Sequence, residues 1–394
     1  MSKLNVCGII CEYNPFHIGH EYQLTEAKKQ TSADYMIVVM SGNFVQRGEP
    51  AVFDKWARTE MALRSGADMV LELPAVYATA SAQYFAIGAV DVLSKTGIVS
   101  TLSFGSESFS GEEGACELQK FVNETLSGPA VDKESLEKGS SFASASRNSL
   151  VNMPNDILAT EYLRALHSLG AEMKVMPIKR IGSGHTGEKS AMFIRKLLSE
   201  GETKKAKELM PQKAADIMQR EINMGKGPVF LKEFDKIILA DLRRLGTEGL
   251  AERPFVSEGL EYKIYKSACQ CSTFEEVVSE CTSKRYTSSR IRRIALASTL
   301  GILRKNLRET APYIRVLGMR RDCGELMDKL QTKACVPVIT SKAKFIKQTE
   351  FDITDSAKEF LKIENNAADL YSLAFSDAAG RMGATEMTHP LVFV

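Results

Sequence analysis

The stretch that most constrains this chain is residues 5–20, NVCGIICEYNPFHIGH, where an apolar run meets a polar turn and then two histidines three positions apart. Residues 6–10 have the pattern of a first strand that is buried on both faces of a parallel sheet. An Asn-Pro pair and a glycine then mark a turn that leads into a helix. Because a helix N-terminus presents unpaired N–H groups and the positive end of the helix dipole, His17 and His20 would lie beside a natural phosphate site.

This order of strand, turn, H-I-G-H and helix resembles the nucleotidylyltransferase superfamily, which includes the class I aminoacyl-tRNA synthetases. The resemblance implies that His17 and His20 hydrogen-bond the phosphates of ATP and stabilise charge at the α-phosphorus. An H-x-x-H pair also occurs by chance in ordinary loops. The glycine and the preceding strand favour the nucleotide interpretation over that alternative.

A basic segment, IKRIGSGHTGEKSAMFIRKLL, follows the H-I-G-H motif by about 170 residues. Within it, Lys189, Ser190 and Arg195 resemble the second signature of the same superfamily, a serine-led helix start followed by an isoleucine-arginine pair. The usual role of that signature is to hold the triphosphate. Residues 191–193 are Ala, Met and Phe, where the signature has small hydroxyl residues, so this segment departs from the family pattern.

The order of expected elements predicts an α/β fold. A doubly wound, Rossmann-like nucleotidylyltransferase domain is expected over residues 1–205, and ligands of such sheets bind at the C-terminal ends of the strands. Its helices are expected over 20–30 and 154–166, the second capped by Asn155 or Asp156, with a core helix in 73–90. Its later strands are expected over 35–40, 69–73, 99–107 and 173–177. Long helix-like stretches then predict a mainly helical, basic domain over 206–394, with a small α/β appendage around 313–340.

Charge is strongly segregated along the chain. The formal net charge is only +2, yet residues 281–321 carry eleven Lys or Arg against one acid. Cationic side chains mixed with a tyrosine and hydroxyls suit phosphate backbones and base stacking, so this segment indicates RNA binding, with a solvated helix face as the alternative. The loop and helix after the second strand carry Arg47, Lys55 and Arg58. These cations also indicate either a functional contact or a solvated helix face. The expected tRNA contacts are Arg47, Lys55, Arg58, Lys284, Arg285, Arg290, Arg292 and Arg293.

Eight cysteines are scattered without paired C-x-x-C spacing, which implies neither zinc nor disulfides, and no protein metal site is expected. The longest uncharged run, residues 73–90, is interrupted by proline and polar residues, so no membrane segment is expected. The N-terminus lacks the basic start and long apolar stretch of a signal peptide. These features predict a cytoplasmic protein.

Five blocks, in the same order over most of the chain, resemble the bacterial tRNA(Met) cytidine acetate ligase family: GIICEYNPFHIGH, SGNFVQRGEPAVFDKWAR, GADMVLELP, PNDILATEYLRAL and KRYTSSRIRR. The resemblance implies that the protein activates free acetate with ATP, and with Mg²⁺, as acetyl-adenylate. It further implies acetylation of N4 of the wobble cytidine of elongator tRNA(Met). The ATP contacts implied by the matching blocks are Val6, Cys7, Gly8, Ile9, Ile10, Cys11, Glu12, Tyr13, Asn14, Pro15, Phe16, His17, Ile18, Gly19, His20, Gly105, Asn155 and Arg180.

Two other functions are compatible with parts of the sequence. A small-molecule adenylyltransferase of the same superfamily would share H-I-G-H but would not explain the basic second half of the chain. A non-catalytic RNA-binding protein would explain the basic half but not the two phosphate signatures.

Overall fold

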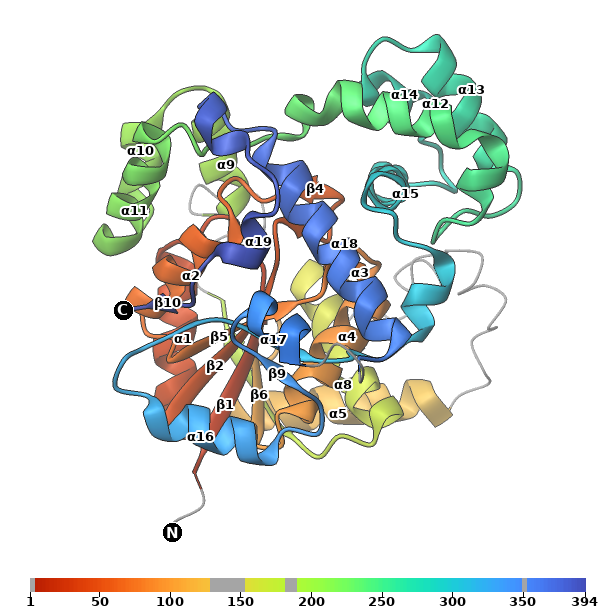
Figure 1. Ribbon diagram of the computed structural model, residues 1–394. Coiled ribbons are helices and arrows are strands. Elements are labelled where there is room, and N and C mark those ends of the chain that lie inside the picture. Colours follow the sequence, from red (N-terminus) through yellow and green to blue (C-terminus); the bar gives the residue numbers. More distant parts are fainter. Residues whose placement is uncertain (1–3, 128–152, 181–189, 349–352) are drawn as a thin grey trace.

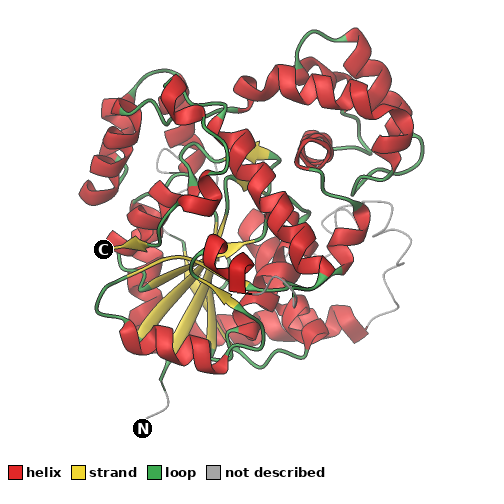
Figure 2. Cartoon of the chain, viewed as in Figure 1, coloured by secondary structure: helices red, strands yellow, loops and turns green. Residues whose placement is uncertain are grey.

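The computed structural model describes residues 4–127, 153–180, 190–348 and 353–394. It confirms the α/β fold: a twisted central sheet is flanked by helices on both faces (Figures 1 and 2). The strands run in the spatial order β10-β8-β5-β2-β1-β6-β7, and β9 pairs with β8. The parallel core of the sheet consists of β1 (Val6–Cys11), β2 (Tyr35–Ser41), β5 (Met69–Leu73), β6 (Thr101–Ser106) and β7 (Lys174–Lys179). All four later strands predicted from the sequence are thus confirmed, each within two residues at either end.

Strand β1 lies at the centre because alternate residues face two separate hydrophobic cores. Val6 and Ile10 contribute to one core, whereas Cys7 and Ile9 contribute to the other. From β1 the chain builds β2 and β5 on one side and then crosses to build β6 and β7 on the other. The point between β1 and β6 is therefore the topological switch point, where open α/β sheets bind ligands.

Helices cover both faces of this sheet. One core includes side chains of α3 (Ala75–Ala78), α4 (Ala82–Lys95), α5 (Gly111–Ser127) and α8 (Pro154–Leu169). The other core includes side chains of α1 (Ile18–Thr31), α2 (Lys55–Arg64), α9 (Ala191–Ser199), α10 (Thr203–Glu208) and α11 (Gln212–Asn223). The run expected as one core helix is divided between α3 and α4. No helix in the described part of the chain is long and apolar enough to span a bilayer.

The predicted cap of α8 is wrong. Met153 is the N-cap residue and makes no side-chain hydrogen bond to the helix, and Pro154 begins the first turn. Asp156 instead turns its carboxylate toward the end of β6, where it accepts hydrogen bonds from the backbone N–H of Glu107 and the hydroxyl of Ser108. An acidic residue in the first helical turn is favoured by the helix dipole even when it does not cap.

The strands of the C-terminal half join the central sheet, which differs from the expected appendage. β8 (Ile314–Met319) pairs antiparallel with β5, and β9 (Val338–Ile339) and β10 (Val392–Phe393) pair with β8. Every residue of β8 is buried, because this strand covers what would otherwise be an exposed sheet edge at β5. In Figure 1 the blue C-terminal segments accordingly lie against the red and orange N-terminal strands.

The remaining helices form a layer beyond the sheet and a C-terminal strap. The helices at the upper right of Figure 1 are α12 (Asp235–Ala251), α13 (Leu260–Gln270), α14 (Phe274–Cys281) and α15 (Ser288–Leu300). The C-terminal helices are α16 (Gly324–Lys333), α17 (Lys342–Gln348), α18 (Asp355–Ser372) and α19 (Thr385–Thr388). Short 3-10 turns are η1 (Leu231–Phe234), η2 (Arg304–Arg308) and η3 (Ala378–Arg381), and a small hairpin joins β3 (Phe44–Val45) to β4 (Glu49–Pro50).

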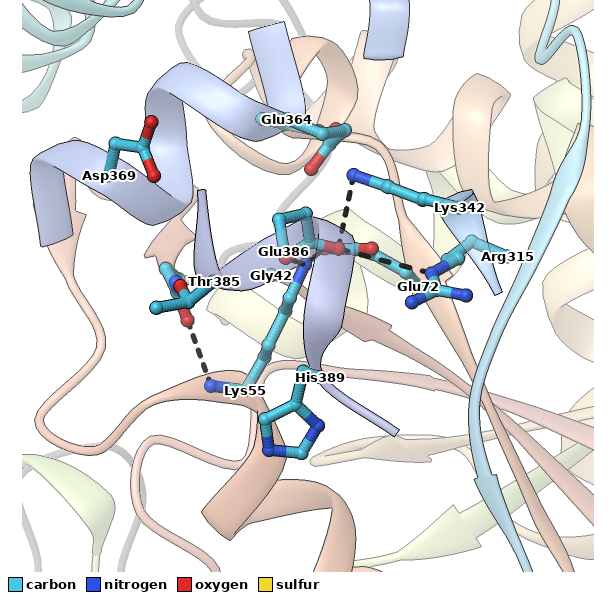
Figure 3. A network of polar contacts seen from close by, with 12 residues as sticks. Gly42, Lys55, Glu72, Arg315, Lys342, Glu364, Asp369, Thr385, Glu386 and His389 are labelled. Carbon is cyan, nitrogen blue, oxygen red and sulfur yellow. Dashed lines mark hydrogen bonds and ion pairs between the residues drawn. The ribbon is translucent and has the colours of Figure 1, made fainter. Parts of the chain in front are cut away.

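A buried network of charges holds the C-terminal strap to the sheet (Figure 3). The Nζ atom of Lys55 lies 2.5 Å from Glu72 Oε1 and 2.7 Å from Glu386 Oε2. Glu386 Oε1 also lies 3.0 Å from Lys342 Nζ and 3.9 Å from Arg315 Nε. Burial favours the neutral form of Glu386, but the ammonium groups of Lys55 and Lys342 outweigh it and lower its pKa to about 2. Because an unpaired buried charge is costly, each of these side chains depends on the others.

Glu364 of α18 lies in the same network, but its pKa is shifted in the opposite direction to that of Glu386. Burial, together with the negative charge of Glu72, raises the pKa of Glu364 to about 8. Its Oε1 atom accepts a hydrogen bond from the backbone N–H of Ala75 at 2.5 Å. The folded protein therefore holds this carboxyl in its neutral form at physiological pH.

Replacing Glu364 with Gln is expected to flatten the pH dependence of stability. The unfolded chain ionises this carboxyl near its ordinary pKa of 4.5, whereas the folded protein retains the proton up to about pH 8. The wild-type protein therefore loses stability through this group as pH rises through that window. Gln cannot ionise and still offers an oxygen to the Ala75 N–H. The thermal midpoint, measured by circular dichroism, should fall a few degrees less for E364Q than for wild type between these two pH values.

A matched control is Asp355→Asn, which removes an exposed carboxylate at the start of the same helix. Its midpoint should follow the wild-type curve. If E364Q and wild type gave parallel curves, Glu364 would be ionised in the folded protein, which would contradict the assignment.

Candidate active site

The two histidines form a reciprocal cap at the start of α1. His17 is the N-cap residue, and its Nδ1 accepts a hydrogen bond from the Gly19 N–H at 3.0 Å. His20 Nδ1 accepts from the His17 N–H at 3.3 Å, and the two rings lie 3.8 Å apart between centroids. Since both Nδ1 atoms act as acceptors, the hydrogen-bond pattern assigns the ring proton of each histidine to Nε2. The cap explains why α1 begins at Ile18, two residues before the expected start.

Both imidazoles are neutral at physiological pH. Burial, reinforced by the positive charges of Arg180 and Arg195, lowers the pKa of His17 to about 4. Burial and the neighbouring His17 hold the pKa of His20 well below its usual value. The backbone N–H groups of this first turn are already paired, so the start of α1 presents two neutral Nε2–H donors at the positive end of the helix dipole, an arrangement suited to an anionic phosphate.

The basic segment that contains Ser190 and Arg195 lies beside the H-I-G-H turn. Arg195 of α9 donates from Nη1 to the backbone carbonyl of Asn14 at 2.7 Å, which brings its guanidinium next to the H-I-G-H turn. Ser190 caps α9, because its hydroxyl accepts the Phe193 N–H at 3.2 Å. Lys189 lies outside the described residues. The phosphate role expected of these three residues stays a prediction, which the position of Arg195 supports.

Gly105, Asn155 and Arg180 come together at the ends of β6 and β7, although more than 20 residues separate each from the next. They surround Glu107, a carboxylate that sequence reasoning did not identify. Asn155 Nδ2 donates to Glu107 Oε1, and Arg180 Nε lies 3.7 Å from the same oxygen. A Cβ atom on Gly105 would lie 3.3 Å from Arg180 Cγ, so glycine allows this side chain to pass closely over the strand. The only sequence signal for Glu107 was its place directly after a glycine-containing strand.

Lys55 and Arg58, which were expected to contact tRNA, point into the protein. Both side chains are essentially inaccessible, with relative exposures of 1% and 0%. Lys55 belongs to the buried network of Figure 3. Arg58 donates to the backbone carbonyls of Phe53 at 2.9 Å, Glu12 at 2.7 Å and Ser41 at 3.0 Å, and also to that of Gly42. The expected helix face is buried because α2 packs beneath the turns that follow β1 and β2.

The basic segment that contains α15 is divided between inward and outward cations. Arg290 is 4% exposed and donates to the carbonyl of Phe255. Arg292 lies 3.1 Å from Glu49 Oε1, and Arg293 Nη1 donates to the carbonyl of Gln46 at 3.4 Å. These three arginines therefore hold parts of the protein together.

Of the cations expected to contact tRNA, those that face outward are Lys284, Arg285 and Arg47. Lys284 and Arg285 are exposed on the loop before α15, and Arg285 also pairs with Glu258. Arg47 is exposed on the hairpin between β3 and β4. The prediction of tRNA contact is therefore retained for these three residues, whose charges reach the surface.

Comparison with known proteins gives a consistent result along the whole chain. Residues 4–386 match the HIGH Nucleotidyl Transferase family. The chain is 36% identical to the tRNA(Met) cytidine acetate ligase of Acetivibrio thermocellus over 99% of this chain and 100% of that protein. It is also 36% identical to the ligase of the same name from Thermotoga maritima, over 96% and 98% of the two chains.

Solved structures agree with this relationship. The fold is similar to that of Thermotoga maritima TmcAL bound with alpha-thio ATP, with a TM-score of 0.91, 35% identity and 99% of both chains covered. The apo form I of the same protein gives a TM-score of 0.88 at 34% identity, with 99% of this chain and 100% of that chain covered. The chain therefore belongs to the tRNA(Met) cytidine acetate ligase family of HIGH nucleotidyl transferases.

Proposed function

We propose that this protein activates acetate with ATP to form acetyl-adenylate and then acetylates N4 of the wobble cytidine of elongator tRNA(Met). The observation that carries the proposal is the pair of neutral Nε2–H donors at the start of α1, beside Arg195 and the switch point of the sheet. The names of the full-length relatives supply the acetate and the tRNA. The expected cytoplasmic location follows from these substrates.

In the first step, an acetate oxygen would attack the α-phosphorus of ATP, and the bond to the bridging oxygen of pyrophosphate would break. Negative charge develops on the oxygens around phosphorus in the transition state. His17 and His20 would donate to these oxygens from preorganised positions, and such donors stabilise the transition state more than the ground state. Arg195 would oppose the charge of the triphosphate.

Mg²⁺ would supply further charge neutralisation on the triphosphate when bound. No group of three or more His, Cys, Asp or Glu side chains that could hold a metal ion lies in the parts of the chain described above. Mg²⁺ commonly binds through substrate phosphates and water with few protein ligands. We therefore expect the phosphates themselves to be its main ligands here.

In the second step, the cytidine N4 would attack the acetyl carbonyl and expel AMP, which requires the base to be splayed out of the anticodon loop. No covalent enzyme intermediate is needed. The two cysteines nearest the histidines are poor nucleophiles, because burial raises the pKa of Cys7 to about 12 and that of Cys11 well above its ordinary value.

The direct test uses purified protein in two assays. Acetate should be required for exchange of labelled pyrophosphate into ATP in the absence of tRNA. Addition of unmodified elongator tRNA(Met) should then yield N4-acetylcytidine, and a transcript with uridine at the wobble position should yield none. Exchange that needs a different acid, or no acid, would point to a small-molecule adenylyltransferase, and tRNA binding without exchange would contradict the enzyme assignment.

Replacing His20 with Ala should reduce acetate-dependent pyrophosphate exchange by roughly 100-fold to 1000-fold, the usual effect of removing one such donor. The protein should remain folded with tRNA affinity near wild type, with only the modest loss of stability expected from removing the His20 Nδ1 half of the cap. Replacing the exposed His167 of α8 with Ala is the matched control and should leave exchange unchanged. Wild-type exchange in folded H20A would exclude the proposed phosphate role.

Replacing Lys284 and Arg285 together with Ala should weaken tRNA binding and make it less sensitive to salt. Each lost phosphate contact should reduce the slope of log affinity against log salt by about 0.7 to 0.9. Acetate-dependent exchange without tRNA should not change. The exposed pair Lys204 and Lys205 on α10 offers a control with the same loss of charge. An unchanged salt slope in the K284A/R285A variant would place the RNA elsewhere.

A further inference from the structure

We infer that the carboxylate of Glu12 accepts the proton that cytidine N4 loses during acetyl transfer, an inference that rests on the proposed function. The family resemblance placed Glu12 among the residues around ATP without a chemical role. Transfer converts an amine that carries two hydrogens into an amide that carries one, so a proton must leave N4 as the new bond forms. General-base assistance to such a step is typically worth about 100-fold to 10,000-fold in rate.

The position of Glu12 is held on two sides. It is the first residue after β1, and its backbone carbonyl accepts a hydrogen bond from Arg58 Nη1 at 2.7 Å. Its side-chain Oε1 accepts the backbone N–H of Gln46 at 2.9 Å. The second carboxylate oxygen, Oε2, has no hydrogen-bond partner among residues with described positions. Glu12 is only partly buried, so this oxygen is available to a substrate.

Glu12 also lies where the nucleotide side and the RNA side of the protein meet. Gln46, which holds the carboxylate, belongs to the hairpin of β3 and β4, and its carbonyl accepts a hydrogen bond from Arg293 of α15. Gly48 of this hairpin packs against the same helix so closely that a Cβ atom would lie 2.6 Å from the Arg293 nitrogen. The exposed cations Lys284 and Arg285 directly precede α15. RNA bound there would lie beside the helix that packs on this hairpin.

Other titratable groups near the turn are unsuited to accept this proton. His17 and His20 carry their ring protons on Nε2 and use Nδ1 within the cap. Glu49 of the hairpin is paired through Oε1 with Arg292. Glu107 is held through Oε1 by Asn155 and Arg180 across the switch point, and its unpartnered Oε2 is buried. Among the described carboxylates of the turn and hairpin, Glu12 is thus the one that combines a free oxygen with the absence of an ion-pair partner.

The groups that surround Glu12 shift its pKa in the direction that suits a proton acceptor. Burial raises the pKa of Glu12, while the Gln46 N–H and the charges of Arg195, Arg47 and Arg58 moderate the rise. These arginines come from α9, the hairpin and α2. Neutral Cys11 and Tyr162 complete the surroundings. A carboxylate with a raised pKa holds a transferred proton better than an ordinary one.

The transfer step balances without a further reactant. The nitrogen–carbon bond to the acetyl carbonyl forms, the bond from that carbon to the AMP oxygen breaks, and its electron pair leaves with AMP. The N4 proton passes to Glu12 Oε2 and from there to solvent. Acetyl-adenylate and cytidine thus give N4-acetylcytidine, AMP and one proton.

The decisive variant is Glu12→Gln, which keeps an oxygen for the Gln46 N–H but cannot take up the proton. Because Glu12 is also among the residues expected around ATP, the test compares two rates in the same variant: acetate-dependent pyrophosphate exchange without tRNA should fall much less than acetyl transfer. Single-turnover transfer from preformed acetyl-adenylate to tRNA should fall at least 100-fold, in line with loss of a general base. The wild-type transfer rate should rise with pH through the pKa of Glu12 and then level, and E12Q should lack that inflection.

Two further variants make the test specific. Glu12→Asp keeps an ionisable group and should recover part of the transfer rate together with the pH inflection. Glu26→Gln removes a partly exposed carboxylate from α1 and should behave as wild type. Wild-type transfer in E12Q, or an equal fall in exchange and transfer, would overturn the inference. Absence of acetate-dependent exchange in the wild-type protein would instead overturn the proposed function.

Discussion

The buried guanidinium of Arg58 is the interaction on which the candidate site depends. It donates to four backbone carbonyls, two of which belong to Glu12, at the end of β1, and Ser41, the last residue of β2. A buried charge is tolerated only where such donors are satisfied, so the turns after these strands have one arrangement that meets the requirement. The H-I-G-H turn continues directly from Glu12. The position of both histidines therefore depends on an arginine that does not contact them.

The site itself is divided across the switch point. On one side of it, His17, His20 and Arg195 present donors and positive charge to a phosphate. On the other, Glu107 holds Asn155 and Arg180 together at the ends of β6 and β7. A carboxylate suits the nucleoside half of a nucleotide better than its phosphates, because it can only accept hydrogen bonds when ionised. In the proposed function, the phosphates of ATP would therefore lie beside the histidines and its nucleoside beside Glu107.

The two halves of the chain share one structural unit. β8 of the C-terminal half extends the sheet at β5, and Glu386 near the C-terminus pairs with Lys55 at the start of α2. Arg292 and Arg293 link α15 to the hairpin that also holds Glu12. Any RNA bound beside α15 would therefore act on a surface that is rigidly connected to the nucleotide turn. Packed contacts of this kind can carry energetic coupling between two sites.

The sequence by itself determined the α/β order, the strand positions and the H-I-G-H turn, because periodicity, turn residues and a helix start are local properties of the chain. It also indicated Gly105, Asn155 and Arg180 through resemblance, but their gathering around Glu107 is a long-range contact. Tertiary packing likewise decided which cations face the solvent. Lys55 and Arg58 have the same local pattern as a solvated helix face, and only the packing of α2 beneath the sheet's loops buried them. Local pattern cannot report burial that comes from residues hundreds of positions away.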